Sequence, residues 1–398
     1  MDLLGLWVEG PVRCSSRFCE PKVVSPVPYC PPGRGIPENY RRFRRVERAV
    51  VRNGIEVFHP RFVVGPGYSL YNFEWMFYYA GIRKLVDRLR ETFQFDLIHA
   101  HFTYPDGAAA TLLGRRYDVP VVITEHIPWE AWVRFPRVLR RAGWAARQAA
   151  RHISVSESVR KSVKSCIGQS GNLMVVPNGV DGEVFTPAAQ EVGKVSTQIL
   201  FAGAVRRVKG VDVLLKALRL LADSGRSVNL VIAGEPFYAG YRKEQERLEG
   251  MVRDLRLLDR VRFVGKKSPT ELARYMQQSA LLVLPSQLES FGMVLVEALA
   301  CGTPVVSTRS GGPEDIVNSQ VGVLVPPGDP EALSRGIADV LDRVELYDPA
   351  KLRAHALSHF GLESVSDRMA EIYRDVVRGH GQRRNMAEAQ FAGDRVAG

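Results

Sequence analysis

The amino-acid sequence predicts an α/β protein with two domains, each organised around a doubly wound parallel sheet. Short apolar runs of strand length alternate along the chain with longer segments of helical spacing, which is the pattern of parallel strands joined by crossover helices. The 398 residues suffice for two domains of ordinary size, each with its own core. A polar stretch over residues 186–197, which contains Pro187 and Gly193, has the composition of a linker between them.

Charge and cysteine usage limit the class of protein. The formal net charge of +11 favours nucleotide phosphates, an anionic membrane surface or nucleic acid as partners. No apolar run approaches the roughly 18 residues of a transmembrane helix, and the N-terminus lacks the basic start and apolar core of a secretory signal. The five cysteines form no ladder of pairs, which is typical of a reducing compartment. We therefore expect a cytoplasmic protein, either free or attached peripherally to the inner face of the membrane.

The N-terminal region combines an irregular start with a run of positive charge. Residues 1–20 show no clear period, and the loop around Gly33 and Gly35 follows a short strand. Five arginines then fall within eight positions: Arg41, Arg42, Arg44, Arg45 and Arg48. Such a run is most often the solvated face of a helix, and the functional alternative is a patch that meets acidic lipid headgroups or phosphates.

Three histidines lie at the predicted carboxyl ends of strands. A buried strand ends at His99 and His101, and the next one is followed by His126. In open parallel sheets ligands meet the loops at these ends. A single histidine at such an end is more often a hydrogen-bonding residue of the core, and we interpret His99 and His101 in this way.

Aromatic and basic residues alternate after His126. The aromatic members are Trp129, Trp132, Phe135 and Trp144, and arginines separate them. The plainest interpretation is a helix that packs its rings on the core and leaves its arginines in water. The alternatives are a membrane interface and, less favoured, a surface for single-stranded nucleic acid.

The most informative stretch runs from Leu281 to Thr308. An apolar run over residues 281–284 predicts a buried parallel strand, residues 293–300 are good helix formers, and Val305 opens the next strand. Glu289 lies in the loop before the helix and Glu297 lies inside it. The free N–H groups at the start of the helix suit an anion, and ionised carboxylates accept hydrogen bonds from sugar hydroxyls.

This stretch, PSQLESFGMVLVEALACGTPVV, resembles the Glu-x7-Glu signature of the retaining glycosyltransferases of family 4. Residues 175–181, VVPNGVD, resemble the segment that leads out of the first domain in that family, and the likeness covers roughly residues 21–378. It implies the GT-B fold, in which two Rossmann-like domains face a cleft that closes over the donor.

The resemblance also implies roles for particular residues. Glu289 and His126 are the catalytic candidates, because they match the family's residues that contact the transferred sugar. Glu297 corresponds to the glutamate that binds the ribose. The substrate-binding candidates are Arg206, Lys209, Gly265, Ser290, Phe291, Gly292, Met293, Val294 and Glu297.

The function that the resemblance implies is transfer of a hexose, with retention, from a nucleotide diphosphate sugar to a saccharide or lipid-linked acceptor. Polysaccharide synthesis at the cell surface is the favoured setting. No Asp-x-Asp motif lies in a suitable loop, so we expect no cofactor and no metal requirement, and we expect no nucleic-acid partner. No Gly-x-Gly-x-x-Gly follows an early strand, which argues against a dinucleotide oxidoreductase.

The sequence departs from the family at two places. The family's diphosphate-binding arginine falls on Ala204, for which Arg206 or Arg207 could substitute. The segment around Val23 resembles the family's second strand, so the first strand–loop–helix unit is either absent or replaced by residues 1–20; alternatively, residues 23–28 form the first strand. These departures keep open an alternative function, an inactive homologue that binds nucleotide sugar without transferring it.

The expected domain limits follow from these segments. Residues 1–186 would form the acceptor-side domain and residues 187–362 the domain that binds the nucleotide sugar. Residues 363–378 would form a helix that crosses back to the first domain, and residues 379–398 a disordered tail.

Overall fold

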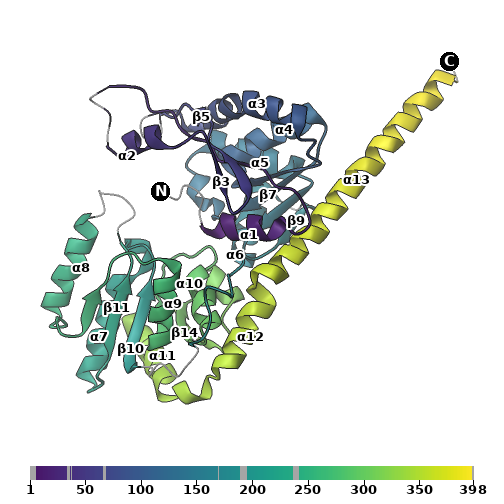
Figure 1. Cartoon of the computed structure of the whole chain (residues 1–398). Helices are drawn as coiled ribbons and strands as arrows, with labels where there is room; N and C mark the ends of the chain where they lie inside the picture. Colours follow the sequence, from purple (N-terminus) through teal and green to yellow (C-terminus); the bar gives the residue numbers. More distant parts are fainter. Residues whose placement is uncertain are drawn as a thin grey trace. The chain divides into compact units, whose positions relative to one another are not determined.

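The computed structural model describes residues 6–33, 36, 38–65, 69–168, 170–188, 195–235 and 242–396. The chain divides into two compact units (Figure 1). Unit 1 comprises Met1–Val176 and Ser366–Gly398, and unit 2 comprises Pro177–Val365. Of the predicted linker, residues 189–194 lie outside the described part of the chain, as does Gly35 of the predicted N-terminal loop.

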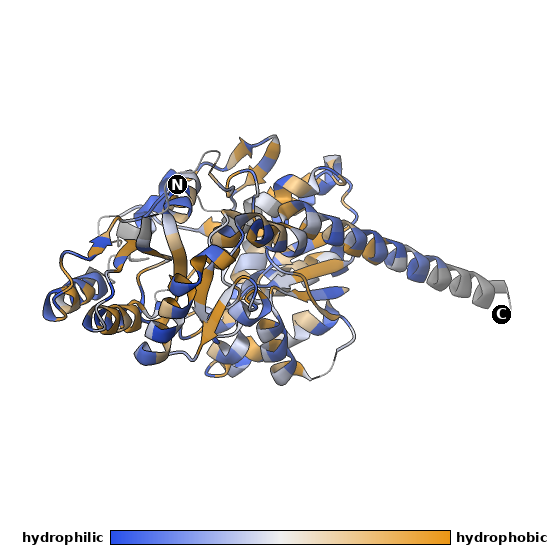
Figure 2. Ribbon diagram, turned by 90° about the horizontal axis from the view of Figure 1, so that it is seen from below, coloured by the Kyte–Doolittle hydropathy of each residue, from blue (hydrophilic) through white to orange (hydrophobic). Residues whose placement is uncertain are grey.

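Unit 2 is a six-stranded parallel sheet in the order β12-β11-β10-β13-β14-β15. The strands are β10 (Val195–Ala202), β11 (Asn229–Ala233), β12 (Val261–Phe263), β13 (Ser279–Leu284), β14 (Val305–Thr308) and β15 (Gly322–Val325). Every residue of the central strand β13 is buried, as the continuous apolar run predicted. Figure 2 shows apolar strands in the interior and helices that are apolar on one side only.

Helices cover both faces of this sheet. They are α7 (Val211–Asp223), α8 (Arg242–Asp254), α9 (Pro269–Gln278), α10 (Met293–Ala300), α11 (Pro330–Asp342) and α12 (Pro349–Phe360), with short 3-10 turns η5 (Arg207–Lys209), η7 (Gly312–Asp315) and η8 (Val344–Leu346). Helix α7 packs beside α11, whereas α10 packs beside α9 and α12. Helix α9 begins with a capping box, which Ser268 and Glu271 form.

Unit 1 has a four-stranded parallel sheet at its centre, in the order β6-β7-β8-β9. Its strands are β6 (Ile98–His101), β7 (Val121–Glu125), β8 (Arg151–Ser154) and β9 (Leu173–Val175). The accompanying helices are α3 (Glu74–Thr92), α4 (Ala108–Tyr117), α5 (Pro136–Gln148) and α6 (Glu157–Ile167), with single turns η2 (Tyr71–Phe73), η3 (Thr103–Gly107) and η4 (Trp129–Trp132). Part of the core is a cluster between α3 and α4 that includes Tyr78, Ile82 and Leu113.

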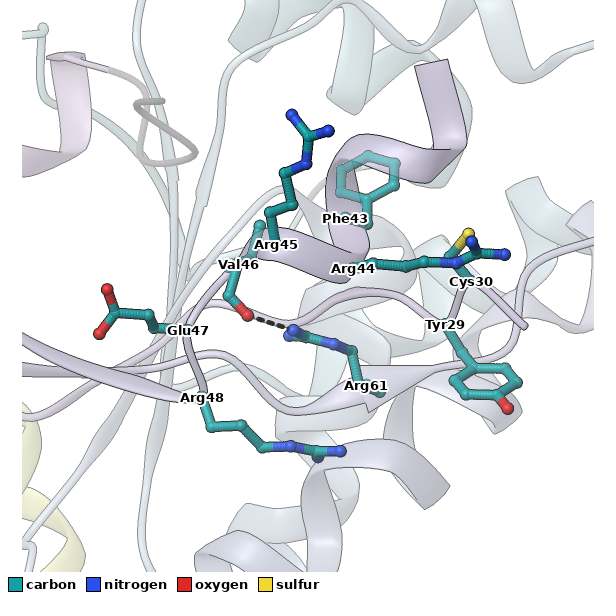
Figure 3. Close-up of a pocket in the computed structure, with 9 residues that line it drawn as sticks. All are labelled: Tyr29, Cys30, Phe43, Arg44, Arg45, Val46, Glu47, Arg48 and Arg61. Carbon is teal, nitrogen blue, oxygen red and sulfur yellow. Dashed lines mark hydrogen bonds between the residues drawn. The ribbon is translucent and has the colours of Figure 1, made fainter. Parts of the chain in front are cut away.

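The N-terminal segment forms two small sheets. Strands β1 (Val23–Val24), β4 (Ile55–Phe58) and β3 (Ala49–Arg52) form one, and β2 (Val27–Pro28) pairs with β5 (Arg61–Phe62) in the other. Within the described residues neither β1 nor β2 pairs with the central sheet. Residues 6–15, which were expected to be irregular, form helix α1 (Leu6–Ser15). Helix α2 (Glu38–Arg41) and the turn η1 (Arg42–Arg45) carry the run of arginines. Three of them, Arg44, Arg45 and Arg48, line a hollow (Figure 3).

The last helix, α13 (Leu362–Val396), is longer than the predicted helix over 363–378. It continues through the segment that was expected to be disordered, where residues 386–390 are good helix formers. From Ser366 onward it belongs to unit 1, where the Arg368 side chain donates to the Val175 carbonyl over 3.2 Å. Across the described parts of the chain, no helix combines the length and apolar character needed to cross a membrane.

The segment after Pro177 packs within unit 2, earlier than the boundary expected at residue 186. The Val180 N–H donates to the Phe360 carbonyl over 2.7 Å, and the Val180 carbonyl accepts from the Leu362 N–H. Arg353 donates to the carbonyls of Gly182 and Phe185. These bonds attach the chain to the end of α12 before β10 begins.

Candidate active site

Two loops at the carboxyl ends of neighbouring strands of unit 2 lie in direct contact. One follows β10 and contains η5, and the other follows β13. The Gln287 N–H donates to the Val208 carbonyl over 2.7 Å. Gly210 adopts φ +68°, and a Cβ at this position would overlap the carbonyl oxygen of Pro285. Glycine is therefore required where these two backbones meet.

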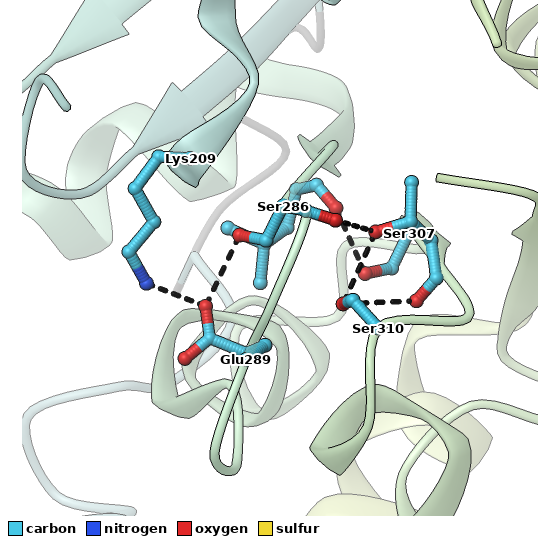
Figure 4. A network of polar contacts seen from close by, with 7 residues as sticks. Lys209, Ser286, Glu289, Ser307 and Ser310 are labelled. Atoms are coloured by element: carbon cyan, nitrogen blue, oxygen red, sulfur yellow. Dashed lines mark hydrogen bonds and ion pairs between the residues drawn. The ribbon is translucent and has the colours of Figure 1, made fainter. Parts of the chain in front are cut away.

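Lys209 and Glu289 form an ion pair across these loops. The Lys209 Nζ lies 2.5 Å from Glu289 Oε2, and the Ser286 hydroxyl donates to the same oxygen over 3.2 Å (Figure 4). The Lys209 side chain is 23% exposed and the Glu289 side chain is 13% exposed. The pair is thus largely withdrawn from solvent and within reach of a ligand.

The Glu289 backbone is held by a third loop, which follows β14. Its N–H donates to the Ser310 carbonyl over 2.9 Å, and its carbonyl accepts from the Gly312 N–H over 2.8 Å. Thr308 Oγ1 donates to the Ser286 carbonyl over 2.5 Å. Three strand ends therefore fix the position of the carboxylate. Because backbone groups make most of these contacts, residue types along the chain do not predict them, apart from the small and hydroxyl residues after each strand.

The loop enters α10 through Gly292, which has φ +104°. The Phe291 side chain is buried and meets Phe360 edge to face, with ring centroids 5.7 Å apart. Of the candidates, Phe291 can thus offer a ligand only its backbone, whereas Ser290, Met293 and Val294 are partly exposed. The first N–H groups of α10 have no partner within the helix and favour an anion.

Glu297 lies in the second turn of α10. Burial raises the pKa of its carboxyl group to about 7. Within the described part of the chain this carboxyl group accepts no hydrogen bond. Burial also raises the pKa of the neighbouring Cys301 thiol to about 12, with the Glu297 charge as a smaller cause. A buried carboxylate without donors is a natural acceptor for hydroxyl groups.

The remaining unit 2 candidates lie nearer to solvent. Arg206 is exposed and immediately precedes η5, in the same loop as Lys209. The Arg207 side chain is 81% exposed, with Nε 3.6 Å from Glu244 Oε2. Gly265 follows the edge strand β12 with φ +69° and is also exposed. The structure thus brings Lys209, Glu289 and the start of α10 together and leaves Gly265 two strands away from β10.

The other catalytic candidate, His126, follows β7 in unit 1. Its Nε2 lies 2.9 Å from His101 Nδ1, and the two rings stack. Burial, and to a smaller extent the neighbouring imidazole of His101, lowers the pKa of His126 well below its usual value. The His126 ring is therefore neutral at pH 7, and one nitrogen of the pair donates to the other.

A buried carboxylate, Glu125, determines the path of the chain around His126. It accepts from the backbone N–H groups of His126 and Ile127 over 2.8 and 3.1 Å, and from Trp129 Nε1 over 2.9 Å. Burial raises the pKa of Glu125 even though these donors lower it. Glu125 was not among the predicted site residues, although its position directly before His126 at a strand end is visible in the sequence.

His99 makes hydrogen bonds inside unit 1, as the sequence predicted, whereas His101 pairs with the candidate His126. His99 Nδ1 lies 2.5 Å from the Tyr373 hydroxyl of α13, and its Nε2 lies 2.8 Å from Thr124 Oγ1. Trp129 and Trp132 are buried, which agrees with the plain interpretation of the aromatic segment. In the parts of the chain that the structure covers, no group of three or more His, Cys, Asp or Glu side chains is arranged to hold a metal ion.

The fold is that of known glycosyltransferases. The structure superposes with a TM-score of 0.71 on HepE from Anabaena, solved in complex with UDP-glucose, at 19% sequence identity; 94% of this chain and 96% of that chain are covered. Two Rossmann-like units with parallel sheets and this likeness define the GT-B class of fold, as the sequence predicted.

Sequence comparison places the chain within that class. The family described as Glycosyltransferase Family 4 matches residues 29–184, and the family described as Glycosyl transferases group 1 matches residues 185–355. A glycogen synthase of Mycobacterium tuberculosis is 30% identical over 319 residues, which are 76% of this chain and 74% of the relative. A D-inositol 3-phosphate glycosyltransferase of Catenulispora acidiphila is 31% identical over 318 residues, 73% of this chain and 75% of the relative. The chain therefore belongs to the group 1, family 4 glycosyltransferases, which use nucleotide sugars.

Proposed function

We propose that the protein transfers a hexose, with retention of configuration, from a nucleotide diphosphate sugar to a saccharide or lipid-linked acceptor in the synthesis of a cell-surface polysaccharide. The observation that carries this proposal is the contact of Lys209 with Glu289 beside the N-terminus of α10. It puts a cation, a carboxylate and free backbone amides in one place. A sugar diphosphate needs all three: positive charge for its phosphates, oriented donors for their oxygens, and an acceptor for its hydroxyl groups.

In this proposal the diphosphate takes the place of Glu289 as the partner of Lys209. The backbone amides of Phe291 to Val294 donate to its oxygens and stabilise the negative charge that develops as it leaves. Glu289 then accepts hydrogen bonds from the hydroxyl groups of the hexose. Glu297 accepts from the ribose, and Arg206 and Gly265 lie along the rest of the nucleotide. For His126 in unit 1, we propose a hydrogen bond to a sugar hydroxyl group.

Retention is proposed from the roles of these groups. The bond from the anomeric carbon to the diphosphate oxygen breaks, and the acceptor oxygen bonds to the same carbon on the same face. The acceptor proton passes to the departing diphosphate. Because Lys209 and the amides supply the compensating charge, we propose that no divalent metal is required. The rate should then be unchanged after treatment with a chelator.

A peripheral membrane location on the cytoplasmic side is proposed from one face of unit 1. Phe73 is exposed on η2 and Val133 directly after η4, and both turns contact α5; Met76 is exposed on α3, which follows η2. Basic residues accompany them: Arg137 lies 5.7 Å above the Phe73 ring, and Arg134 is also exposed. Apolar side chains beside arginines suit an anionic lipid surface, where a lipid-linked acceptor would be found.

The test begins with donor binding. UDP-, GDP- and ADP-glucose are added separately, and we expect one of them to raise the melting temperature, since a ligand of the native state stabilises it. Release of free nucleotide with an acceptor present then separates transfer from the alternative function, binding without transfer.

The decisive variant is Glu289→Ala. We expect transfer to fall by at least about 100-fold, the magnitude typical of an interaction made in the transition state. The matched control is Glu246→Ala, which removes an exposed carboxylate from α8. Wild-type turnover by Glu289→Ala would refute the role of this residue.

A further inference from the structure

Ser286 lies two residues beyond the end of β13, and it has no exposed surface. Its hydroxyl donates to Glu289 Oε2 over 3.2 Å (Figure 4). Among the residues that the structure describes, this is the only hydrogen bond that the hydroxyl group makes. Because the residue is fully buried, bulk water does not compete for the proton, so Ser286 is a dedicated donor to Glu289.

The backbone around this hydroxyl group is fixed on both sides. The Ser286 carbonyl accepts from Thr308 Oγ1 over 2.5 Å, and the N–H of the next residue, Gln287, donates to the Val208 carbonyl over 2.7 Å. These bonds tie the segment to the end of β14 and to the loop that contains η5. The hydroxyl group can therefore move only by rotation about one side-chain bond, and a donor held in this way orders a carboxylate at little further cost in conformational entropy.

The two carboxylate oxygens of Glu289 have different surroundings. Oε2 accepts from both Lys209 Nζ and Ser286 Oγ, and Figure 4 shows both bonds ending on this one oxygen. Within the described parts of the chain, no hydrogen bond reaches the other oxygen, Oε1. One oxygen is thus anchored by the protein, and the other is left to accept from a hydroxyl group of a ligand.

Lys209 and Ser286 respond differently to a nucleotide sugar. In the proposed function the ammonium group of Lys209 turns from Glu289 to the diphosphate, whose charge attracts it. Ser286 is uncharged and fully buried, so it stays with Glu289. Once the donor is bound, Ser286 is then the one described residue that still donates to the Glu289 carboxylate.

We propose that Ser286 is a positioning residue for the transfer reaction. Its hydroxyl holds Oε2 of Glu289 while Lys209 binds the diphosphate, so that Oε1 accepts from the hexose. This inference rests on the proposed function and adds to that site a residue that does not itself touch the donor. The angle of the carboxylate affects an interaction made in the transition state, whereas binding of the diphosphate uses Lys209 and the backbone amides at the start of α10. Loss of the Ser286 hydroxyl should therefore lower kcat and leave KM for the nucleotide sugar unchanged.

The test compares Ser286→Ala with Ser307→Ala in the full-length protein. Ser307 lies on the neighbouring strand β14 and is equally buried, but its hydroxyl donates to the Leu284 carbonyl over 2.9 Å. Each change removes one buried hydroxyl group near a strand end, so we expect similar losses of stability in urea unfolding. The probe is whichever of UDP-, GDP- and ADP-glucose raises the melting temperature of wild type most, and kcat and KM are measured from release of free nucleotide with water as the acceptor.

We expect kcat of Ser286→Ala to fall about 10-fold, the effect typical of one hydrogen bond to a charged group, with KM within about twofold of wild type. Ser307→Ala should keep both constants within about twofold. A double variant separates positioning from a general loss of packing. When Ser286→Ala is added to Glu289→Ala, kcat should change by less than about twofold, because no carboxylate remains to be held.

An unchanged kcat in Ser286→Ala, equal losses of kcat in the two serine variants, or the same loss with and without Glu289 would each overturn the positioning role. None of these results would affect the proposed function. Wild-type turnover by Glu289→Ala would instead refute the role of Glu289 itself, and the positioning role of Ser286 with it.

Discussion

Glu297 provides a quantitative test of the candidate site, because its burial predicts how the stability of unit 2 depends on pH. Its pKa is raised from 4.5 to about 7 in the folded protein. Between pH 4.5 and about pH 7, Glu297 has lost its proton in the unfolded chain but retains it in the folded protein. The free energy of unfolding therefore decreases as the pH rises from about 4.5 to about 7, and the full cost is present above pH 7.

The magnitude follows from this difference in pKa. At about 1.36 kcal/mol for each pKa unit, the difference of about 2.5 units makes the cost above pH 7 at most about 3.4 kcal/mol. Because the side chain is only partly buried by area, we expect about 2 kcal/mol. Glu297→Gln removes the charge and keeps the shape. We compare the free energy of unfolding of the variant with that of wild type at each pH. The variant's advantage should be about 2 kcal/mol larger at pH 8 than at pH 4.5.

The assay is urea unfolding at several pH values, monitored by circular dichroism. All five tryptophans precede residue 145 and belong to unit 1, so their fluorescence reports on that unit separately. When the free energy of unfolding of wild type is subtracted from that of the variant, the contributions of the other titrating groups cancel. Glu246→Gln, an exposed control on α8, should show no pH-dependent difference. A difference between Glu297→Gln and wild type that stays constant from pH 4.5 to 8 would contradict the assigned burial.

Two further substitutions test the packing around the candidate residues. Gly312→Ala would place a Cβ against the backbone of Phe291, so we expect a loss of about 2 kcal/mol in urea unfolding and weaker donor binding; Gly250→Ala, in a helix with free space, should be neutral or slightly stabilising. Trp129→Phe removes a donor to the buried carboxylate of Glu125, which should cost about 1 to 3 kcal/mol. Unchanged stability of unit 1 in that variant would show that Glu125 does not need this bond.

Much of unit 2 could be predicted because its signals are local. The apolar run of β13, the helix formers of α10 and the glycine at the turn between them each depend on a few neighbouring residues. Glu289 could be proposed as a site residue because a carboxylate at a strand end, beside a helix N-terminus, has a recognisable chemistry.

The contacts of those residues could not be predicted in the same way. Lys209 and Glu289 are 80 positions apart in sequence, and their ion pair depends on the adjacency of β10 and β13 in the sheet. For the aromatic segment that contains Trp129 and Trp132, packing on the core was one of three interpretations, beside a membrane interface and a nucleic-acid surface. Composition alone does not show which side of a segment faces the core. The length of α13 was underestimated, since its last part carries no strong apolar period.

The sequence by itself determined the alternation of strands and helices, the two-domain organisation and the family, because each of these depends on residue order over short distances. Only the tertiary structure decided which loops meet, which carboxyl groups are buried and where the N-terminal arginines gather around a hollow. These features depend on the order of strands in a sheet and on exclusion of water, and both arise only when distant segments pack together.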